Sequence, residues 1–170
     1  MNNNFPFPSD GKRYFTWNRY LRDTFDMKIF KVALDAGFDC PNRDGTVAYG
    51  GCTFCSVAGS GDFAGDKVDP IPVQFEKIRD KMHEKWKKGK YIAYFQAYTN
   101  THAPLPVLKE KFEAALALEG VIGISIATRP DCLPDDVVEY LAELNKRTFL
   151  WIELGLQTVH ERTANLVNRA

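Results

Sequence analysis

Short apolar runs alternate with longer amphipathic segments along most of this chain. The runs at residues 91–98, 121–128 and 149–158 are rich in aromatic and β-branched side chains, which favour strands. Because their apolar character is nearly continuous, we expect strands that are buried on both faces, as in a parallel sheet covered by helices. The alternation therefore predicts an α/β fold.

The predicted order begins with a strand at residues 29–38, which runs into a loop rich in cysteine and glycine. Helices are predicted at residues 73–90, 106–120, 134–147 and 159–170, and a strand follows each of the first three. Pro106 suits the first turn of its helix and Gly120 suits the C-cap. Right-handed crossovers then give an open sheet or an arc of a barrel. The apolar positions of the first of these helices recur near helical spacing at Val73, Phe75, Ile78, Met82 and Trp86.

The composition suits one compact domain with a real core, since 45% of the 170 residues are hydrophobic. The 22 basic and 22 acidic residues cancel, so the overall charge indicates no particular partner. No apolar run reaches the ~20 residues that span a bilayer, and the first residues lack a signal sequence. We expect a cytoplasmic protein without a membrane partner. The last predicted helix has no cap, which favours the front part of a longer protein.

Residues 39–56 read DCPNRDGTVAYGGCTFCS and hold three of the four cysteines. In a reducing compartment, clustered cysteines more often bind metal or do chemistry than form disulfides. One interpretation is a zinc-stabilised α/β binding module without redox chemistry, with Cys132 as the fourth ligand. Others are a thioredoxin-like pair, incidental structural thiols, or a [4Fe–4S] cluster that keeps one iron open. An open iron, to which a substrate or cofactor can bind directly, would explain an incomplete set of three ligands.

Ligands of parallel α/β sheets bind at the carboxyl ends of the strands. This rule selects the cysteine loop and the segments at residues 96–104, 128–134 and 153–158, which we expect to converge on one face. Glu153 is a charge within an otherwise apolar run. A buried carboxylate requires a partner, so we expect Glu153 to belong to the site.

The phrases KVALDAGFDCPNRDGT, GGCTFCS, FQAYTNTHAP, IATRPDCLP and ELGLQT resemble the radical S-adenosylmethionine (SAM) enzymes. They look like the branch often called YtqA/YhcC-type, which is similar to the catalytic subunit of Elongator. Most of the superfamily spaces its first two cysteines by three residues, whereas eleven separate Cys40 from Cys52 here. The resemblance implies a partial, TIM-barrel-like (β/α) barrel at residues 27–170. Its first four βα units would be present, after an N-terminal arm at residues 1–26.

The resemblance also implies an enzyme that cleaves SAM reductively to a 5′-deoxyadenosyl radical. Cys40, Cys52 and Cys55 would hold the [4Fe–4S] cluster, and SAM would bind its open iron. An external one-electron reductant of the flavodoxin or ferredoxin type is implied, and no catalytic residue is assigned beyond the cluster ligands. The residues expected to contact SAM are Phe54, Gln96, Thr99, Asn100, Ser125, Thr128, Arg129, Glu153 and Gln157.

The sequence constrains the substrate least. Residues 11–25 interleave basic and aromatic side chains, a combination that suits RNA. The same residues would also suit an arm that packs its aromatic rings against the barrel. The resemblance to the Elongator branch implies modification of tRNA, at a wobble uridine, by analogy at the level of the fold.

Overall fold

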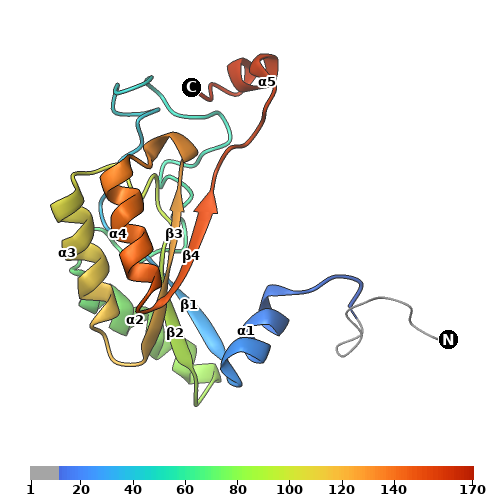
Figure 1. The fold of residues 1–170 in the computed structure, drawn as a ribbon, viewed down its shortest axis with the longest axis vertical. Coiled ribbons are helices and arrows are strands. Elements are labelled where there is room, and N and C mark those ends of the chain that lie inside the picture. The colour runs from blue at the N-terminus through green and yellow to red at the C-terminus, as the bar shows by residue number, and fades with distance from the viewer. Residues whose placement is uncertain (1–11) are drawn as a thin grey trace.

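The computed structural model describes residues 12–170 and contains one sheet of four parallel strands in the order β1-β2-β3-β4 (Figure 1). The predicted α/β class and its partial (β/α) barrel are confirmed. Within the described residues, no helix is long and apolar enough to cross a membrane. In chain order the elements are α1 (Trp17–Phe25), β1 (Ile29–Leu34), α2 (Ile71–Lys85), β2 (Lys90–Phe95), α3 (Leu105–Leu116), β3 (Val121–Thr128), the 3-10 helix η2 (Pro130–Cys132), α4 (Asp135–Asn145), β4 (Phe149–Leu154) and α5 (Glu161–Leu166).

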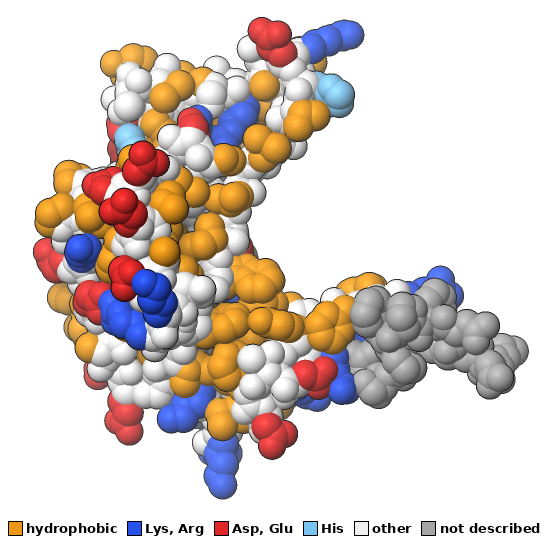
Figure 2. All heavy atoms as spheres, viewed as in Figure 1, with side chains coloured by type: hydrophobic (Ala, Val, Ile, Leu, Met, Phe, Trp, Pro, Cys, Tyr) orange, Lys and Arg blue, Asp and Glu red, His pale blue; other side chains and the backbone are white. Residues whose placement is uncertain are grey.

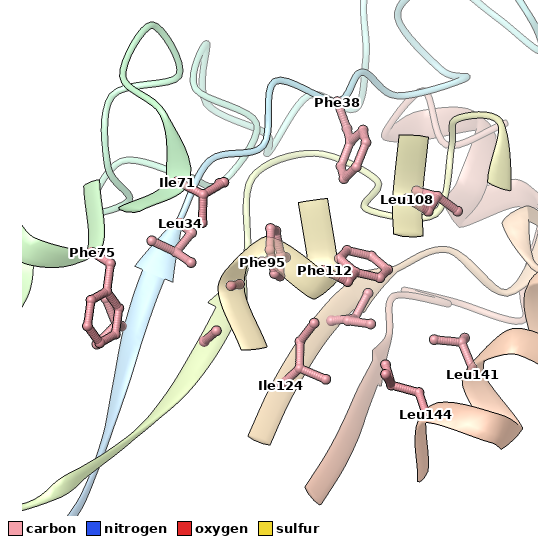
Figure 3. Close-up of a cluster of buried hydrophobic side chains, with 14 of the residues drawn as sticks. Leu34, Phe38, Ile71, Phe75, Phe95, Leu108, Phe112, Ile124, Leu141 and Leu144 are labelled. Carbon is pink, nitrogen blue, oxygen red and sulfur yellow. The ribbon is translucent and has the colours of Figure 1, made fainter. Parts of the chain in front are cut away.

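The outer face of the sheet is covered by α2, α3 and α4, which line up along one side in Figure 1. Alternate residues of each strand point to this side, such as Val32 and Leu34 of β1. They meet Phe75 of α2 and Phe112 of α3 in a continuous apolar core (Figure 3). This layer fixes the strands so that their carboxyl ends lie along one edge.

The inner face of the sheet carries a different set of residues. Its lower part is apolar, and α1 packs there through Leu21 against Ile29 and Ile92. Trp17 of α1 lies against Trp151 of β4, with 4.1 Å between the ring centroids. In Figure 2, helix α1 and the upper lobe around α5 lie on either side of a concave surface lined by hydrophobic side chains. Helix α1 therefore covers the lower part of the inner face and leaves the upper part open.

The strands end earlier than the apolar runs of the sequence. The runs at residues 29–38, 91–98 and 149–158 stop being strand after Leu34, Phe95 and Leu154. The reason is that the last residues of each run leave the sheet to build loops at the carboxyl edge. For example, the N–H of Thr99 donates to Asp39 O at 3.2 Å, and the N–H of Gly155 donates to Thr128 O at 2.8 Å.

Several details of the predicted helices were wrong, including the last helix, which ends at Leu166 and not at residue 170. Helix α2 begins at Ile71 and ends at Lys85, so Trp86 lies beyond the helix, where its backbone is extended. Val73 lies within α2, but its side chain is 37% exposed and is not part of the core. A buried position of α2 is instead taken by Gln74, whose amide hydrogen-bonds both the N–H and the carbonyl oxygen of Asp35. Gly120 is not the C-cap of α3, since α3 ends at Leu116. It adopts a φ of +79° in the turn before β3.

The predicted N-terminal arm contains α1, a helix that the sequence analysis did not predict. Thr16 caps it, since its side-chain oxygen accepts the N–H of Arg19 at 3.1 Å. Residues 1–11 of the arm lie outside the described part of the chain. The division into an arm at residues 1–26 and a core at residues 27–170 stays a prediction.

Candidate metal and cofactor site

A pocket of about 280 Å³ lies at the carboxyl edge of the sheet, between the cysteine loop and the ends of β2, β3 and β4. The four segments that the strand-end rule selected therefore converge, as expected. Ten of the twelve predicted site residues line this pocket: Cys40, Cys52, Phe54, Cys55, Gln96, Thr99, Thr128, Arg129, Glu153 and Gln157. Their roles there stay predictions.

The remaining two predicted residues, Asn100 and Ser125, do not line the pocket. Asn100 is fully buried, and its Nδ2 donates to the carbonyl oxygens of Phe95 and Ala127 at 3.1 and 2.9 Å. It therefore joins the ends of β2 and β3. Ser125 is also buried and donates to Glu153 Oε1 at 3.3 Å, so it reaches the pocket through that carboxylate. The positions of these two residues give no support to direct contact with SAM.

Tight turns shape the cysteine loop. The carbonyl oxygen of Cys40 accepts the N–H groups of Arg43 and Asp44 at 2.7 and 3.1 Å. In the C-x-x-C pair, the N–H of Cys55 donates to Cys52 O at 3.0 Å. All three thiols are half-buried and line the same pocket. Gly51, directly before Cys52, has a φ of +74°, a conformation that favours glycine. A Cβ at this position would lie 2.7 Å from the Arg43 side chain.

The thiols are not gathered about one point. Among residues 12–170, no group of three or more His, Cys, Asp or Glu side chains could hold a single metal ion. A single zinc ion draws its sulfur ligands to about 3.8 Å from one another, as tetrahedral bonds of about 2.3 Å require. In an iron–sulfur cubane, each thiolate binds its own iron, so the sulfurs lie further apart. The three thiols therefore share a pocket without forming a single-ion site among the described residues.

The fourth cysteine, Cys132, belongs to a different segment of the chain from the cysteine loop. It lies in η2 and lines a second pocket, beside His102 and Pro134. Burial raises the pKa of the Cys132 thiol to about 11. His102 makes a loop contact in which Nε2 lies 2.7 Å from Asp44 Oδ2. Cys132 therefore does not share the pocket of the three loop thiols.

Arg129 is buried in the wall of the cysteine pocket. Its Nε and Nη2 donate to the two carboxylate oxygens of Asp131 at 2.8 and 2.5 Å, and Nη2 also donates to Ala170 O. The hydrogen bonds that Arg129 donates to the Asp131 carboxylate raise the pKa of its guanidinium. Nη1 is buried and has no hydrogen-bond partner among the described residues. A buried donor without a partner is costly, so Nη1 is positioned to bind an anionic ligand.

The Glu153 carboxylate accepts hydrogen bonds from side chains on each of the other three strands. Its Oε1 accepts from Lys31 Nζ of β1 at 2.5 Å, and its Oε2 accepts from Tyr94 Oη of β2 at 2.7 Å. Burial raises the pKa of Glu153, but the hydrogen bonds from Lys31 and Tyr94 outweigh it, and the net pKa is lowered. Burial and the Glu153 carboxylate also raise the pKa of Tyr94. The pocket floor thus holds a stable carboxylate and a neutral phenol.

Three residues around the pocket have left-handed backbone conformations that non-glycine residues rarely adopt, namely Ser60, Tyr98 and Gln157, with φ of 66°, 60° and 71°. Tyr98 is held by several contacts. Its N–H donates to Gly59 O at 2.8 Å, its hydroxyl donates to Val57 O at 2.6 Å, and the Arg43 guanidinium lies 5.4 Å from its ring. Strained backbone that is held in this way concentrates at functional sites.

The sequence analysis missed several side chains of this pocket and its floor. Lys31 carried the same signal as Glu153, a charge within an apolar strand, and could have been found by the same rule. Tyr94 looked like one more aromatic residue in a buried run, and only its place on the inner face reveals its role. Arg43, Tyr98 and Arg169 also line the pocket, and they carried no distinctive sequence signal.

Comparison with known proteins identifies the family. The model of the radical SAM superfamily matches residues 40–170, which is most of the chain. The chain belongs to the radical SAM superfamily. The resemblance of the sequence motifs to radical SAM enzymes is therefore confirmed at the level of the superfamily. Members of this superfamily are SAM-cleaving enzymes with iron–sulfur clusters.

Among relatives, the chain is 73% identical over 170 residues to YtqA of Bacillus subtilis, and the match covers 100% of the chain and 53% of YtqA. It is 40% identical over 150 residues to YhcC of Escherichia coli, covering 88% of the chain and 47% of YhcC. An uncharacterised protein of Methanocaldococcus jannaschii is 37% identical over 164 residues, covering 95% of the chain and 49% of that protein. The chain thus spans about half the length of the curated relatives it matches.

The donors in the pocket fit the cofactors of the radical SAM superfamily. Three thiols are the right ligand type for an iron–sulfur cluster, and the loop contributes no fourth cysteine. Arg129 Nη1 is a buried cationic donor without a partner among the described residues, which is a type of group that suits a carboxylate. Phe54 is 55% exposed at the rim, where an aromatic face is open to a ligand.

Proposed function

We propose that this chain is the cluster- and SAM-binding part of a radical SAM enzyme, with Cys40, Cys52 and Cys55 as ligands of a [4Fe–4S] cluster. The observation that carries the proposal is their convergence with Arg129 on one pocket at the carboxyl edge of the sheet. The cluster, once reduced, would supply the electron that splits SAM into methionine and a 5′-deoxyadenosyl radical. A reductant of the flavodoxin or ferredoxin type is part of this proposal.

Each protein group has a proposed task in this pocket. Arg129 binds the SAM carboxylate through Nη1, while its pairing with Asp131 holds the guanidinium still. Glu153, kept ionised by Lys31, offers acceptor oxygens to hydroxyl groups of the ligand. Phe54 packs near the adenine. Gln96, Thr99, Thr128 and Gln157 offer neutral donors and acceptors from the strand ends.

Iron and sulfide content after anaerobic reconstitution tests the ligand assignment. We expect about four irons and four sulfides per chain, as the cluster stoichiometry requires. Cys40→Ala, Cys52→Ala and Cys55→Ala should each lose most of the iron and stop the release of 5′-deoxyadenosine from SAM. Cys132→Ala is the matched control and should keep both. Retention of the cluster in all three loop variants would refute the assignment.

The same experiment separates this function from a zinc-stabilised binding module. Such a module would purify without colour and with one tightly bound zinc. Family membership and the position of Cys132 both weigh against it, since a closed zinc site needs a fourth ligand near the loop. One zinc per chain, insensitive to reconstitution with iron and sulfide, would favour the module.

We further propose tRNA as the substrate, with a wobble uridine as the modified position, because of the resemblance to the Elongator branch. The N-terminal arm gives this proposal less support than the sequence suggested. Trp17 and Tyr20 pack on the sheet, whereas Tyr14 and Phe15 remain exposed. Nucleoside mass spectrometry of tRNA from cells with and without the protein is the test. An unchanged nucleoside profile would refute the tRNA proposal and leave the radical chemistry intact.

A further inference from the structure

Asn42 is a completely buried asparagine within the cysteine loop. Its Nδ2 donates to Cys52 Sγ at 3.4 Å and to the backbone carbonyl oxygen of Asn168 at 2.6 Å. Its Oδ1 accepts the N–H of Ala170 at 3.3 Å. A side-chain amide has two N–H donors and one acceptor oxygen, and each has a matching partner here. These partners fix the orientation of the amide, so that an N–H faces the sulfur.

The surroundings keep Asn42 in place. Its own carbonyl oxygen accepts the N–H of Gly51 at 2.8 Å, directly before Cys52. The N–H of Thr53 donates to Val167 O at 3.0 Å, which ties the C-x-x-C pair to the segment that follows α5. Asn42 therefore lies at the junction of the cysteine loop and residues 167–170, and it cannot turn away from Cys52 without breaking several hydrogen bonds.

A hydrogen bond to a ligand sulfur changes the electronic properties of an iron–sulfur cluster. Reduction adds negative charge, part of which resides on the sulfurs, so an N–H that points at a sulfur stabilises the reduced state more than the oxidised state. Reduction potentials of such clusters accordingly depend on hydrogen bonds to the sulfurs. Burial strengthens the effect, because little water competes at a side chain that is 0% exposed.

We infer that Asn42 is a positioning residue that raises the reduction potential of the cluster through its N–H···S hydrogen bond to Cys52. The inference rests on the proposed function, since it requires Cys52 to bind iron. It also gives residues 167–170 a role, because the carbonyl oxygen of Asn168 and the N–H of Ala170 orient the amide that reaches the sulfur.

The reduction potential of the reconstituted protein, followed by electron paramagnetic resonance in an anaerobic redox titration, tests the inference. Asn42→Leu removes both N–H donors at similar volume, and Asn42→Asp replaces them with a negative charge. At a fixed potential, we expect the ratio of reduced to oxidised cluster to fall about tenfold in Asn42→Leu, which is about 59 mV for one electron. The fall should be larger in Asn42→Asp.

Asn168→Gly is the matched control. It removes the hydrogen bonds from the Asn168 side chain to Gly51 O and Tyr49 O, at 2.7 and 3.2 Å, but touches no sulfur. Glycine also tolerates the φ of 51° at this position. Asn42 bonds to the backbone oxygen of Asn168, which this variant keeps. We therefore expect the ratio of reduced to oxidised cluster to stay within about twofold of the wild type, a smaller change than the loss of one neutral hydrogen bond would cause. An unchanged ratio in Asn42→Leu would overturn the inference.

A second measurement needs no variant, which covers the case in which the Asn42 variants fail to bind a cluster. Wild-type protein grown with asparagine labelled with ¹⁵N in the side-chain amide is reduced, and pulsed paramagnetic resonance is used to look for ¹⁵N coupled to the cluster. A coupled side-chain nitrogen supports the inference, and its absence from a loaded cluster overturns it. A wild-type chain that takes up no cluster refutes the proposed function itself, and this inference with it.

Discussion

Lys31 and Glu153 form an ion pair across the inner face of the sheet, with side chains that are 25% and 35% exposed. Lys31→Met should leave the Glu153 carboxylate without its cation, raise its pKa and destabilise the fold by about 1–2 kcal/mol at pH 7. This is less than for a fully buried pair, because water screens part of the charge. Urea unfolding at several pH values measures the loss.

The pH dependence of this loss has a definite sign. The lowered pKa of Glu153 means that the pair stabilises the fold above the ordinary value of 4.5 and stops doing so as pH falls through the folded pKa. The difference between wild type and Lys31→Met should therefore shrink in acid. The double variant Lys31→Met with Glu153→Gln is the control and should recover part of the stability. A difference that grows in acid would contradict this account.

Arg129 offers a separate test at the scale of one residue, through the affinity for SAM. Arg129→Lys keeps a cation but loses the guanidinium whose Nη1 is unpartnered in the pocket wall. We expect the dissociation constant of SAM to rise about tenfold or more, as the loss of a charge-assisted hydrogen bond implies. Isothermal titration calorimetry on the reconstituted protein measures this.

Arg147→Lys is the matched control for Arg129→Lys. Arg147 pairs with Glu113 on the helical side, away from the cysteine pocket, and is 50% exposed. Its replacement should leave SAM binding unchanged. Equal affinities in the wild type and both variants would show that Arg129 serves only its pair with Asp131.

Among the elements, α1 is the one whose role changes most between sequence and structure. Its aromatic side chains could have faced a nucleic acid, but Trp17 packs against Trp151 and Tyr20. Trp17→Ala should therefore lower the free energy of unfolding by about 2–3 kcal/mol, somewhat less than for a fully buried tryptophan. Tyr14→Ala, at a side chain that is 65% exposed, should change it by less than about 0.5 kcal/mol.

Urea denaturation of Trp17→Ala and Tyr14→Ala measures these changes in the free energy of unfolding. If Trp17→Ala were as stable as the wild type, α1 would be loosely attached and its aromatic rings free to bind a partner. If Tyr14→Ala weakened binding to RNA without loss of stability, the exposed part of the arm would acquire a role in recognition.

The elements also show what the sequence could and could not predict. The strands and the helices on the outer face were predictable, because apolar runs and amphipathic periods depend on local sequence. Their common carboxyl edge followed from parallel topology, and ten of the twelve predicted site residues line the pocket there. Lys31 and Tyr94 were missed because their role depends on which face of the sheet they occupy. Asn42 was missed because two of its three side-chain partners, Asn168 and Ala170, lie more than a hundred residues away.

At the scale of the whole molecule, the sheet carries different chemistry at different levels of its inner face. Helix α1 covers the lower level, a charged and phenolic row around Glu153 forms the middle, and the cysteine pocket lies at the carboxyl edge. This order places the proposed cluster at the edge of the sheet and polar groups beneath it. The chain spans about half the length of its curated relatives, so the substrate and partners of the whole protein remain proposals.

The central claim is that three thiols leave one iron open, and that SAM binds there. Electron–nuclear double resonance of the reduced protein with SAM labelled with ¹⁵N at its amino group tests this most directly. The account predicts a ¹⁵N coupling strong enough to show direct binding to iron, present in the wild type and in Cys132→Ala. A loaded cluster that shows no such coupling with saturating SAM would contradict the claim.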